Sequence, residues 1–340
     1  MSKRLHDNAG IIGLHWFYSH LFYSSFFSST YFMSIQWYPG HMHKAGKEIK
    51  NMLPQVDLVI EILDARIPFS SQNPFLAKLR GDKPCIKLLN KSDLADPALT
   101  EVWQQHFEQE HGVKTLAVSS GQIDRIRQIP ELCRKLLPTK AAQERLIHAL
   151  IMGIPNVGKS TLINILAGRV VAKTGNEPAI TKMLQRIAIP GHIVLLDSPG
   201  MLWPKVENRN SGYRLATTGA IKDTAIAHDD IALFAGEYLL QHYPDLVKAR
   251  YQLEPLPERE QPLLDAIGRK RGCLKAGDCV DGDKAAKLLL SELRAGLLGR
   301  MTFETPEMVA QELAELEKLR LEKEAQKALR KQNSKAQRSS

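Results

Sequence analysis

Three short motifs that recognise a nucleotide occur in this chain of 340 residues, and their order is unusual. Asn90-Lys-Ser-Asp93 has the form of the NKxD element that selects guanine. It precedes Gly153-Ile-Pro-Asn-Val-Gly-Lys-Ser160, a P-loop, although a Ras-like chain carries its P-loop first. Asp197-Ser-Pro-Gly200 comes last and has the form of the element that senses the metal and the γ-phosphate. This order constrains the fold more than any single motif does.

The context of the P-loop favours phosphate binding over a glycine-rich turn without a ligand. An apolar run over 147–152 ends at Gly153, and an apolar helical pattern over 161–166 follows Ser160. Strand, glycine loop and helix in succession are what a P-loop requires.

Further strands are expected at 56–63, 84–89 and 115–118, with a hairpin of 185–189 and 192–196. Most of these runs end in a motif, and helical patterns separate several of them. The pattern predicts a doubly wound α/β sheet with its ligand at the carboxyl edge of the strands.

The chain divides by composition into four segments. Residues 33–205 hold the nucleotide motifs and are expected to form the GTPase domain. Helical spacing over 212–304, interrupted by prolines, predicts a smaller all-helical domain at 206–305. Residues 306–340 read as a charged helical tail that becomes disordered and basic from Ala325 onward.

Residues 1–32 are rich in Phe, Tyr, Ser and His and lack an apolar run long enough to span a bilayer. Three interpretations stand: an extension that does not belong to the native protein, a targeting segment, or a membrane anchor. The first is favoured because Met33 opens a segment of different composition. A mitochondrial transit sequence comes second, because such sequences contain more arginine than residues 1–32 do. We therefore expect no stable membrane association and a cytoplasmic location, with the mitochondrial matrix as the alternative.

The net charge of +9 favours an anionic macromolecule as the partner, although a soluble basic protein is the simpler interpretation. Four scattered cysteines form no CxxC pair, so a zinc site is not expected and a reducing compartment fits best. The most concentrated basic cluster lies in the helical segment and consists of Arg269, Lys270, Arg271 and Lys275. It is suited to RNA phosphates, or else it complements the dipole at a helix end.

The motifs predict where each part of GTP is held. The P-loop amides and Lys159 hold the β- and γ-phosphates, while Ser160 and Asp197 hold Mg²⁺. The amide of Gly200 meets the γ-phosphate. The predicted GTP contacts are Asn90, Lys91, Asp93, Ser119, Ser120, Gly121, Asn156, Val157, Gly158, Lys159, Ser160, Thr161, Asp197 and Gly200.

Guanine is selected by the Asp93 carboxylate, which accepts hydrogen bonds from donors that adenine lacks. Asn90 and Lys91 brace this loop. Ser119-Ser-Gly121 follows a strand and is placed to touch the guanine oxygen, although serine-rich turns after strands are common.

Hydrolysis is harder to assign. Thr181 is the expected switch I threonine that closes on Mg²⁺, with a strand-initiating threonine as the competing interpretation. Met201 stands directly after Gly200, where a Ras-like enzyme has the glutamine that orients water. His41 is a candidate for that task, although a lone histidine is more often structural.

Several of these motifs resemble those of the circularly permuted YlqF/RbgA-type GTPases. The resemblance covers about residues 33–305 and rests on the motif order and on further motifs that begin at Trp37, Asp64 and Thr218. It implies a permuted Ras-like domain followed by a helical RNA-contacting domain. The expected function is GTP hydrolysis during late assembly of the large ribosomal subunit.

The resemblance also implies stimulation by the ribosomal particle and by K⁺, the latter through Asn156. It implies a role for His41 in hydrolysis, and Met201 fits because the family has an apolar residue there. The switch I segment departs from the family, since it reads Ala-Ile-Thr where Gly-Val-Thr is commoner. Residues 1–32 also lie outside the family pattern.

A GTP-dependent RNA-binding placeholder with negligible turnover is the alternative, because Met201 cannot orient water. Transport-type and tRNA-modifying GTPases share the P-loop sequence, but they have the usual motif order. The expected partners are GTP or GDP and the precursor of the large subunit with its rRNA, bound by a monomer. The expected cofactors are Mg²⁺ and, as an activator, K⁺.

Overall fold

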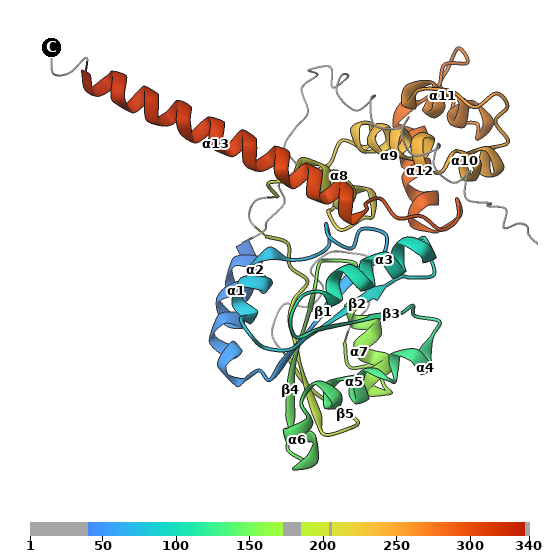
Figure 1. Cartoon of the computed structure of the whole chain (residues 1–340). Coiled ribbons are helices and arrows are strands. Elements are labelled where there is room, and N and C mark those ends of the chain that lie inside the picture. The colour runs from blue at the N-terminus through green and yellow to red at the C-terminus, as the bar shows by residue number, and fades with distance from the viewer. Residues whose placement is uncertain (1–39, 173–184, 204–205, 337–340) are drawn as a thin grey trace, which may run out of the picture. The chain divides into compact units, whose positions relative to one another are not determined.

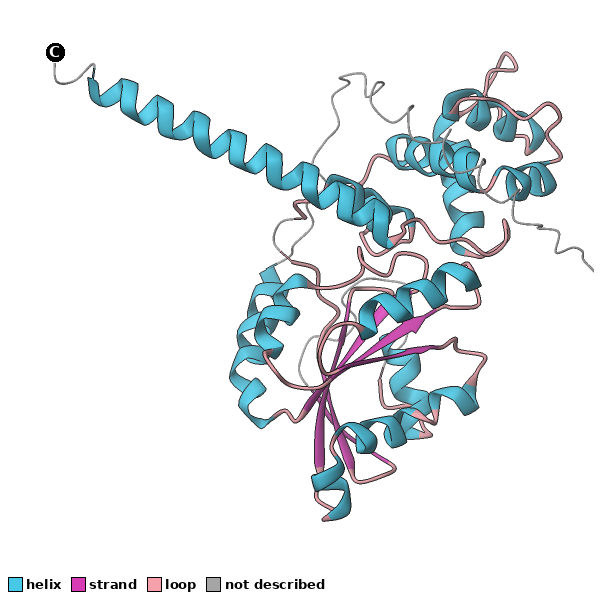
Figure 2. Ribbon diagram, viewed as in Figure 1, coloured by secondary structure: helices cyan, strands magenta, loops and turns pink. Residues whose placement is uncertain are grey.

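A computed structural model describes residues 40–172, 185–203 and 206–336. Its centre is a six-stranded sheet in the order β3-β2-β1-β4-β6-β5 (Figures 1 and 2). All neighbouring strands are parallel except β5, which forms an antiparallel hairpin with β6. The strands are β1 (Leu58–Asp64), β2 (Cys85–Asn90), β3 (Val113–Ala117), β4 (Ile147–Gly153), β5 (Gln185–Ile189) and β6 (Ile193–Asp197).

Every residue of β1 and β2 is buried, as expected for the central strands of a sheet that helices cover on both faces. Helices α1 and α2 lie on one side of the sheet, and α4, α5 and α7 lie on the other (Figure 1). The helices of this part are α1 (Gly40–Met52), α2 (Pro74–Arg80), α3 (Pro97–Glu108), α4 (Ile123–Ile126), α5 (Ile129–Leu136), α6 (Pro138–Ala142) and α7 (Lys159–Ala167), with the short 3-10 helix η1 (Leu53–Gln55) after α1. We call residues 40–203, as far as they are described, the GTPase part.

The expected strands are present, with shifted ends. β1 begins at Leu58 rather than at residue 56, and β6 runs from Ile193 rather than from residue 192. Four strands include the first polar or glycine residue of the motif that follows them. Asp64, Asn90, Gly153 and Asp197 therefore belong to the sheet, which fixes their backbone positions.

The helical part follows, with α9 at its centre in contact with α8, α10, α11 and α12. Its core includes the stacked rings of Tyr213 and Phe234, whose centroids are 5.1 Å apart. The elements are α8 (Arg209–Thr217), the 3-10 helix η2 (Asp223–Ala225), α9 (His228–His242), α10 (Pro244–Tyr251), α11 (Glu260–Lys270) and α12 (Gly282–Arg294). None of the described helices is long and apolar enough to cross a membrane.

After α12 the chain returns to the GTPase part. The Met301 amide donates to the Leu94 carbonyl at 3.0 Å, and the Phe303 amide donates to the Arg66 carbonyl at 2.7 Å. The indole of Trp103 on α3 donates to the Glu304 carbonyl at 3.0 Å. The predicted domain boundaries stay a prediction, and these contacts join segments on either side of them.

Buried charges hold this return segment. Arg214 on α8 lies 3.4 Å from a Glu304 carboxylate oxygen and forms two hydrogen bonds, of 2.9 and 2.6 Å, with the carboxylate of Glu312. Ser70 donates its amide and its hydroxyl to Glu304. We call Arg214, Glu304 and Glu312 the α8 clamp. It connects α8 to the last helix, α13.

The expectation of disorder from Ala325 is wrong for most of that stretch. α13 (Pro306–Ala336) continues as one helix to residue 336. Its residues have high helix propensity, and its exposed face carries neighbouring charge pairs such as Arg320 with Glu324 at 3.4 Å.

Candidate nucleotide site

The motifs that are separated along the sequence meet at one edge of the sheet. In the strand register Asp64 lies beside Asn90, Ile62 beside Gly153, and Ile151 beside Asp197. The strand β1 therefore stands between the base-selecting strand β2 and the P-loop strand β4. The edge brings together every motif that the sequence singled out on these strands, whatever their order along the chain.

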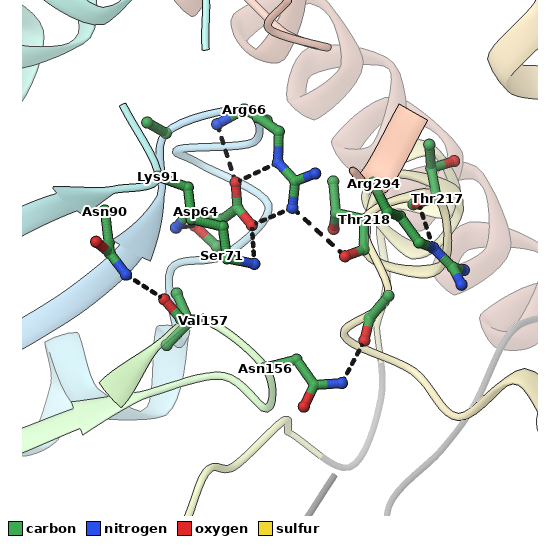
Figure 3. A network of polar contacts seen from close by, with 12 residues as sticks. Asp64, Arg66, Ser71, Asn90, Lys91, Asn156, Val157, Thr217, Thr218 and Arg294 are labelled. Atoms are coloured by element: carbon green, nitrogen blue, oxygen red, sulfur yellow. Dashed lines mark hydrogen bonds and ion pairs between the residues drawn. The ribbon is translucent and has the colours of Figure 1, made fainter. Parts of the chain in front are cut away.

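The guanine-selecting loop braces the P-loop directly. The Asn90 side-chain amide donates to the Val157 carbonyl at 2.7 Å (Figure 3). Gly158 has a φ of +94°, and a Cβ there would stand 2.3 Å from the Asn90 amide nitrogen. Only glycine permits this approach. Asn156 also has a positive φ, of 58°, and its side chain is half-buried.

Lys159 and Asp197 form a buried ion pair between the start of α7 and the end of β6. Burial raises the pKa of Asp197, and the attraction of Lys159 opposes that rise. The second carboxylate oxygen of Asp197, Oδ2, is buried without a hydrogen-bond partner among the described residues. A carboxylate oxygen without a partner, on a residue paired with Lys159 next to the P-loop serine Ser160 in sequence, fits a Mg²⁺ ion, since that ion prefers oxygen ligands.

A cavity of about 1300 Å³ opens beside these motifs. Asp93 is exposed on its wall, so its carboxylate is accessible to a base. Ser120 is exposed and lines the cavity, whereas Ser119 is buried and its carbonyl accepts from the Gln122 amide at 2.9 Å. Gly121 is exposed but does not line this cavity.

A charge cluster lies at the centre of this edge, and the motif analysis had assigned only one of its members, Lys91, to the site. Arg66 donates to both carboxylate oxygens of Asp64, at 2.9 and 2.7 Å, and Lys91 lies 3.0 Å from the same carboxylate (Figure 3). Burial alone would raise the pKa of Asp64, but Arg66 and Lys91 outweigh it and hold that pKa well below its usual range. We call these three residues the nucleotide-edge cluster. The sequence could have pointed to this cluster, because Asp64 stands at the end of a strand, as the other motifs do.

The helical part supplies the opposite wall of the cavity. The turn after α8 receives hydrogen bonds from three elements (Figure 3). Asn156 of the P-loop donates to the Gly219 carbonyl at 2.8 Å, Arg66 donates to the Thr218 carbonyl at 3.5 Å, and Arg294 of α12 donates to the Thr217 carbonyl at 3.0 Å. Further wall residues from the helical part are Ile221, Lys222, Asp223, Thr224, His228, Lys287, Leu290, Ser291 and Ala295.

Comparisons with known proteins agree with this geometry. A family model described as "50S ribosome-binding GTPase" matches residues 148–242. A Bacillus cereus protein named ribosome biogenesis GTPase A is 45% identical over 294 residues, covering 84% of this chain and 99% of the relative. The chain belongs to the ribosome biogenesis GTPase A family.

A mouse relative named mitochondrial ribosome-associated GTPase 1 is 33% identical over 294 residues, which cover 78% of this chain and 89% of the relative. The solved structure of GNP-bound YlqF from T. maritima is also similar, with 27% identity and a TM-score of 0.55. That match covers 78% of this chain and 99% of YlqF.

As a member of the ribosome biogenesis GTPase A family, the chain is a GTP-binding and GTP-hydrolysing ribosome assembly factor. Its fold is a circularly permuted GTPase part followed by a helical part. The predicted GTPase function and the predicted fold class are both confirmed. A GTPase of this kind depends on Mg²⁺, and its partners are a guanine nucleotide and a ribosome-related particle.

The side chains of two predicted site residues lie outside what the structure describes, and the predicted RNA contacts lie away from the cavity. Thr181 lies outside the described residues, and so does the side chain of His41, although the backbone of residue 41 belongs to α1. Met201 is buried, with 2% of its surface exposed. The basic cluster is exposed around the end of α11, away from the lining of the cavity, and consists of Arg269, Lys270, Arg271 and Lys275.

Proposed function

We propose that this GTPase acts in late maturation of the large ribosomal subunit. In the GTP state it binds rRNA on the precursor particle, and hydrolysis releases it. The family description and the names of the relatives support a ribosomal partner, and the net charge of +9 supports an anionic one. The proposal includes action as a monomer in the cytoplasm. The mitochondrial matrix is the alternative location, because one relative is named for mitochondrial ribosomes.

The observation that carries the proposal is the shared cavity. Its lining comes from the guanine-selecting loop and the P-loop on one side and from the 218–224 segment and α12 on the other. The P-loop side chain of Asn156 donates a hydrogen bond to the carbonyl of Gly219, which lies between α8 and α9 of the helical part. A change of nucleotide at the P-loop therefore acts directly on the part that we propose contacts RNA.

The phosphates of GTP take over Lys159 from Asp197, because the two side chains form an ion pair in the described structure. Asp197 and Ser160 would hold Mg²⁺, and Thr181 would be a third ligand. The ion neutralises charge that develops on the phosphate oxygens. The amide of Gly200 contacts the γ-phosphate.

Water has to be oriented by a residue other than Met201, whose side chain is buried in the core. We assign this task to His41. Asn156 is assigned to a K⁺ ion that activates hydrolysis. The exposed cluster at the end of α11 is assigned to rRNA phosphates. Within it Arg271 and Lys275 lie 3.6 and 3.5 Å from acidic groups, which partly offset their charges.

The test is GTP hydrolysis by the full chain with and without purified large-subunit precursor particles, first in K⁺ and then in Na⁺. The proposal predicts a strong increase with particles in K⁺ and a smaller one in Na⁺. Small-subunit particles serve as the matched control. No stimulation by large-subunit particles in K⁺ would overturn the proposed role while leaving the GTPase assignment intact.

The same experiment addresses the second candidate, a GTP-dependent RNA-binding placeholder. The buried side chain of Met201 favours it, because no glutamine follows Gly200 to activate water. A placeholder binds the particle more tightly with GTP than with GDP, yet shows no turnover above that of the free chain.

A further inference from the structure

The segment that follows Gly200 is held by hydrogen bonds to both backbone groups of Met201. The Met201 amide donates to the carbonyl of Gly153, at the start of the P-loop, at 3.1 Å. The Met201 carbonyl accepts from the side-chain amide of Asn73 at 3.4 Å. With its side chain buried as well, Met201 is an anchor for the switch rather than a group that faces the nucleotide.

Asn73 is itself held by a residue of the central sheet. Its backbone amide donates to the side-chain carboxylate of Glu61 on β1 at 3.0 Å, and both residues are at most 5% exposed. Burial raises the pKa of Glu61 to about 7, and Lys87 of β2 opposes that rise. Glu61 belongs to a fully buried central strand, so the support beneath Asn73 is part of the rigid sheet.

The fit between the switch and the P-loop leaves little freedom. A Cβ on Gly200 would stand 3.2 Å from the Cα of Pro155, and one on Gly153 would stand 2.8 Å from the Ile62 carbonyl. Gly200 is thus bounded by the backbone of the P-loop at its Cα and by the anchored Met201 at the peptide that follows it. A small shift of Met201 moves the Gly200 amide relative to the phosphates.

We propose that Asn73 is a positioning residue for GTP hydrolysis. Its side-chain amide holds the Met201 carbonyl and thereby keeps the Gly200 amide in register with the P-loop. The proposal rests on the assigned contact between Gly200 and the γ-phosphate. Asn73 then affects the hydrolysis of GTP and not the binding of GDP, which lacks that phosphate.

A structural role must be separated from this one, because Asn73 directly precedes α2 at a helix-capping position. Serine and aspartate cap helices about as well as asparagine. In Asn73→Ser the side chain is too short to reach the Met201 carbonyl. In Asn73→Asp the side chain keeps its size but no longer donates a hydrogen bond to that carbonyl. Asp96→Ser is the matched control, because Asp96 caps α3 and accepts from the Ala98 amide at 2.9 Å.

The experiment measures kcat and KM for GTP, the affinity for GDP, and the thermal midpoint of each full-length variant. Loss of one hydrogen bond predicts that kcat falls about 3- to 10-fold in both Asn73 variants, with GDP affinity unchanged within about twofold. Asp96→Ser keeps the kcat of the parent. An unchanged kcat in either folded Asn73 variant, or a parallel loss of kcat and GDP affinity, overturns the proposal. If Asn73→Asp fails to fold because it buries a charge, Asn73→Ser decides.

Discussion

The nucleotide-edge cluster and the α8 clamp are both buried groups of charges, yet they differ in how completely their polar atoms are satisfied. In the α8 clamp the Arg214 guanidinium contacts Glu304, Glu312 and the Phe303 carbonyl, and none of its nitrogens lacks a partner. In the nucleotide-edge cluster Arg66 leaves one buried nitrogen, Nη1, without a hydrogen bond among the described residues.

The neighbours of the nucleotide-edge cluster show the same incompleteness. The side-chain oxygen Oδ1 of Asn90 and the carboxylate oxygen Oδ2 of Asp197 are buried with no hydrogen-bond partner among the described residues. Buried polar atoms without partners cost free energy, so proteins retain them where a ligand completes the set. We therefore expect the satisfied cluster to serve stability and the incomplete one to serve ligand binding.

The largest expected effect tests the binding side. Asp93→Asn replaces an acceptor with a mixed donor and acceptor, so guanine loses its partner and xanthine gains one. We expect the preference for GTP over XTP to change by about 10⁴-fold, by the logic of a site built for a group that the analogue lacks. Because Asp93 is exposed, the thermal midpoint should barely move. Competition binding of the two nucleotides measures the effect, and an unchanged preference would contradict the assignment.

The stability side is tested by Arg214→Met, which keeps most of the volume and removes the charge. Glu304, with none of its surface exposed, then loses its cation. Removing one partner of a buried pair costs about 3–5 kcal/mol of the free energy of unfolding. Chemical denaturation measures this loss, and the double variant with Glu304→Gln should recover part of it. A loss below about 1 kcal/mol would show that the α8 clamp does not hold the helical part.

The two clusters should also respond to pH with opposite signs. The pKa of Asp64 is held below its usual range, so its stabilisation is present at neutral pH and is lost as pH falls through the folded-state pKa. Burial raises the pKa of Glu304 despite Arg214 and Ser70, so its contribution is largest at low pH and is lost as pH rises through the raised pKa.

Denaturation of Asp64→Asn and Glu304→Gln at several pH values between about 2 and 8 separates these signs, because the Asp64 effect falls below its usual pKa and the Glu304 effect above its own. Relative to the parent chain, Asp64→Asn should become more destabilised as pH rises, reaching about 2 kcal/mol. Glu304→Gln should become less destabilised over the same range. Parallel slopes for the two variants would remove the distinction between the clusters.

The sequence predicted the nucleotide edge well because each motif follows a strand, and parallel strands end at the same edge. Asn90, Gly153 and Asp197 were placed by that rule without knowledge of the strand order. The α8 clamp could not be predicted in this way. Arg214 and Glu304 are 90 positions apart in sequence, and no local pattern pairs a helix residue with a loop so distant.

The contact of Asn73 with Met201 was missed for the same reason, since 128 positions separate the two residues. The tail was mispredicted for a different reason. A basic composition after Ala325 indicated disorder, yet the helix propensity of Ala, Lys, Gln and Arg carries α13 to residue 336. The composition of this segment predicted its basic charge correctly, but it predicted its conformation incorrectly.

The smallest expected effect on the free energy of unfolding concerns an exposed ion-pair network. Arg320 on α13 is 64% exposed and lies 3.4 Å from Glu324 and 3.9 Å from Glu317. Arg320→Ala should change the free energy of unfolding by less than about 0.5 kcal/mol, because water screens exposed ion pairs. It is the matched counterpart of Arg214→Met, since both remove an arginine that faces two carboxylates. If Arg320→Ala cost as much as Arg214→Met, burial would not be what distinguishes the α8 clamp, and α13 would pack against something more than the part of the chain described.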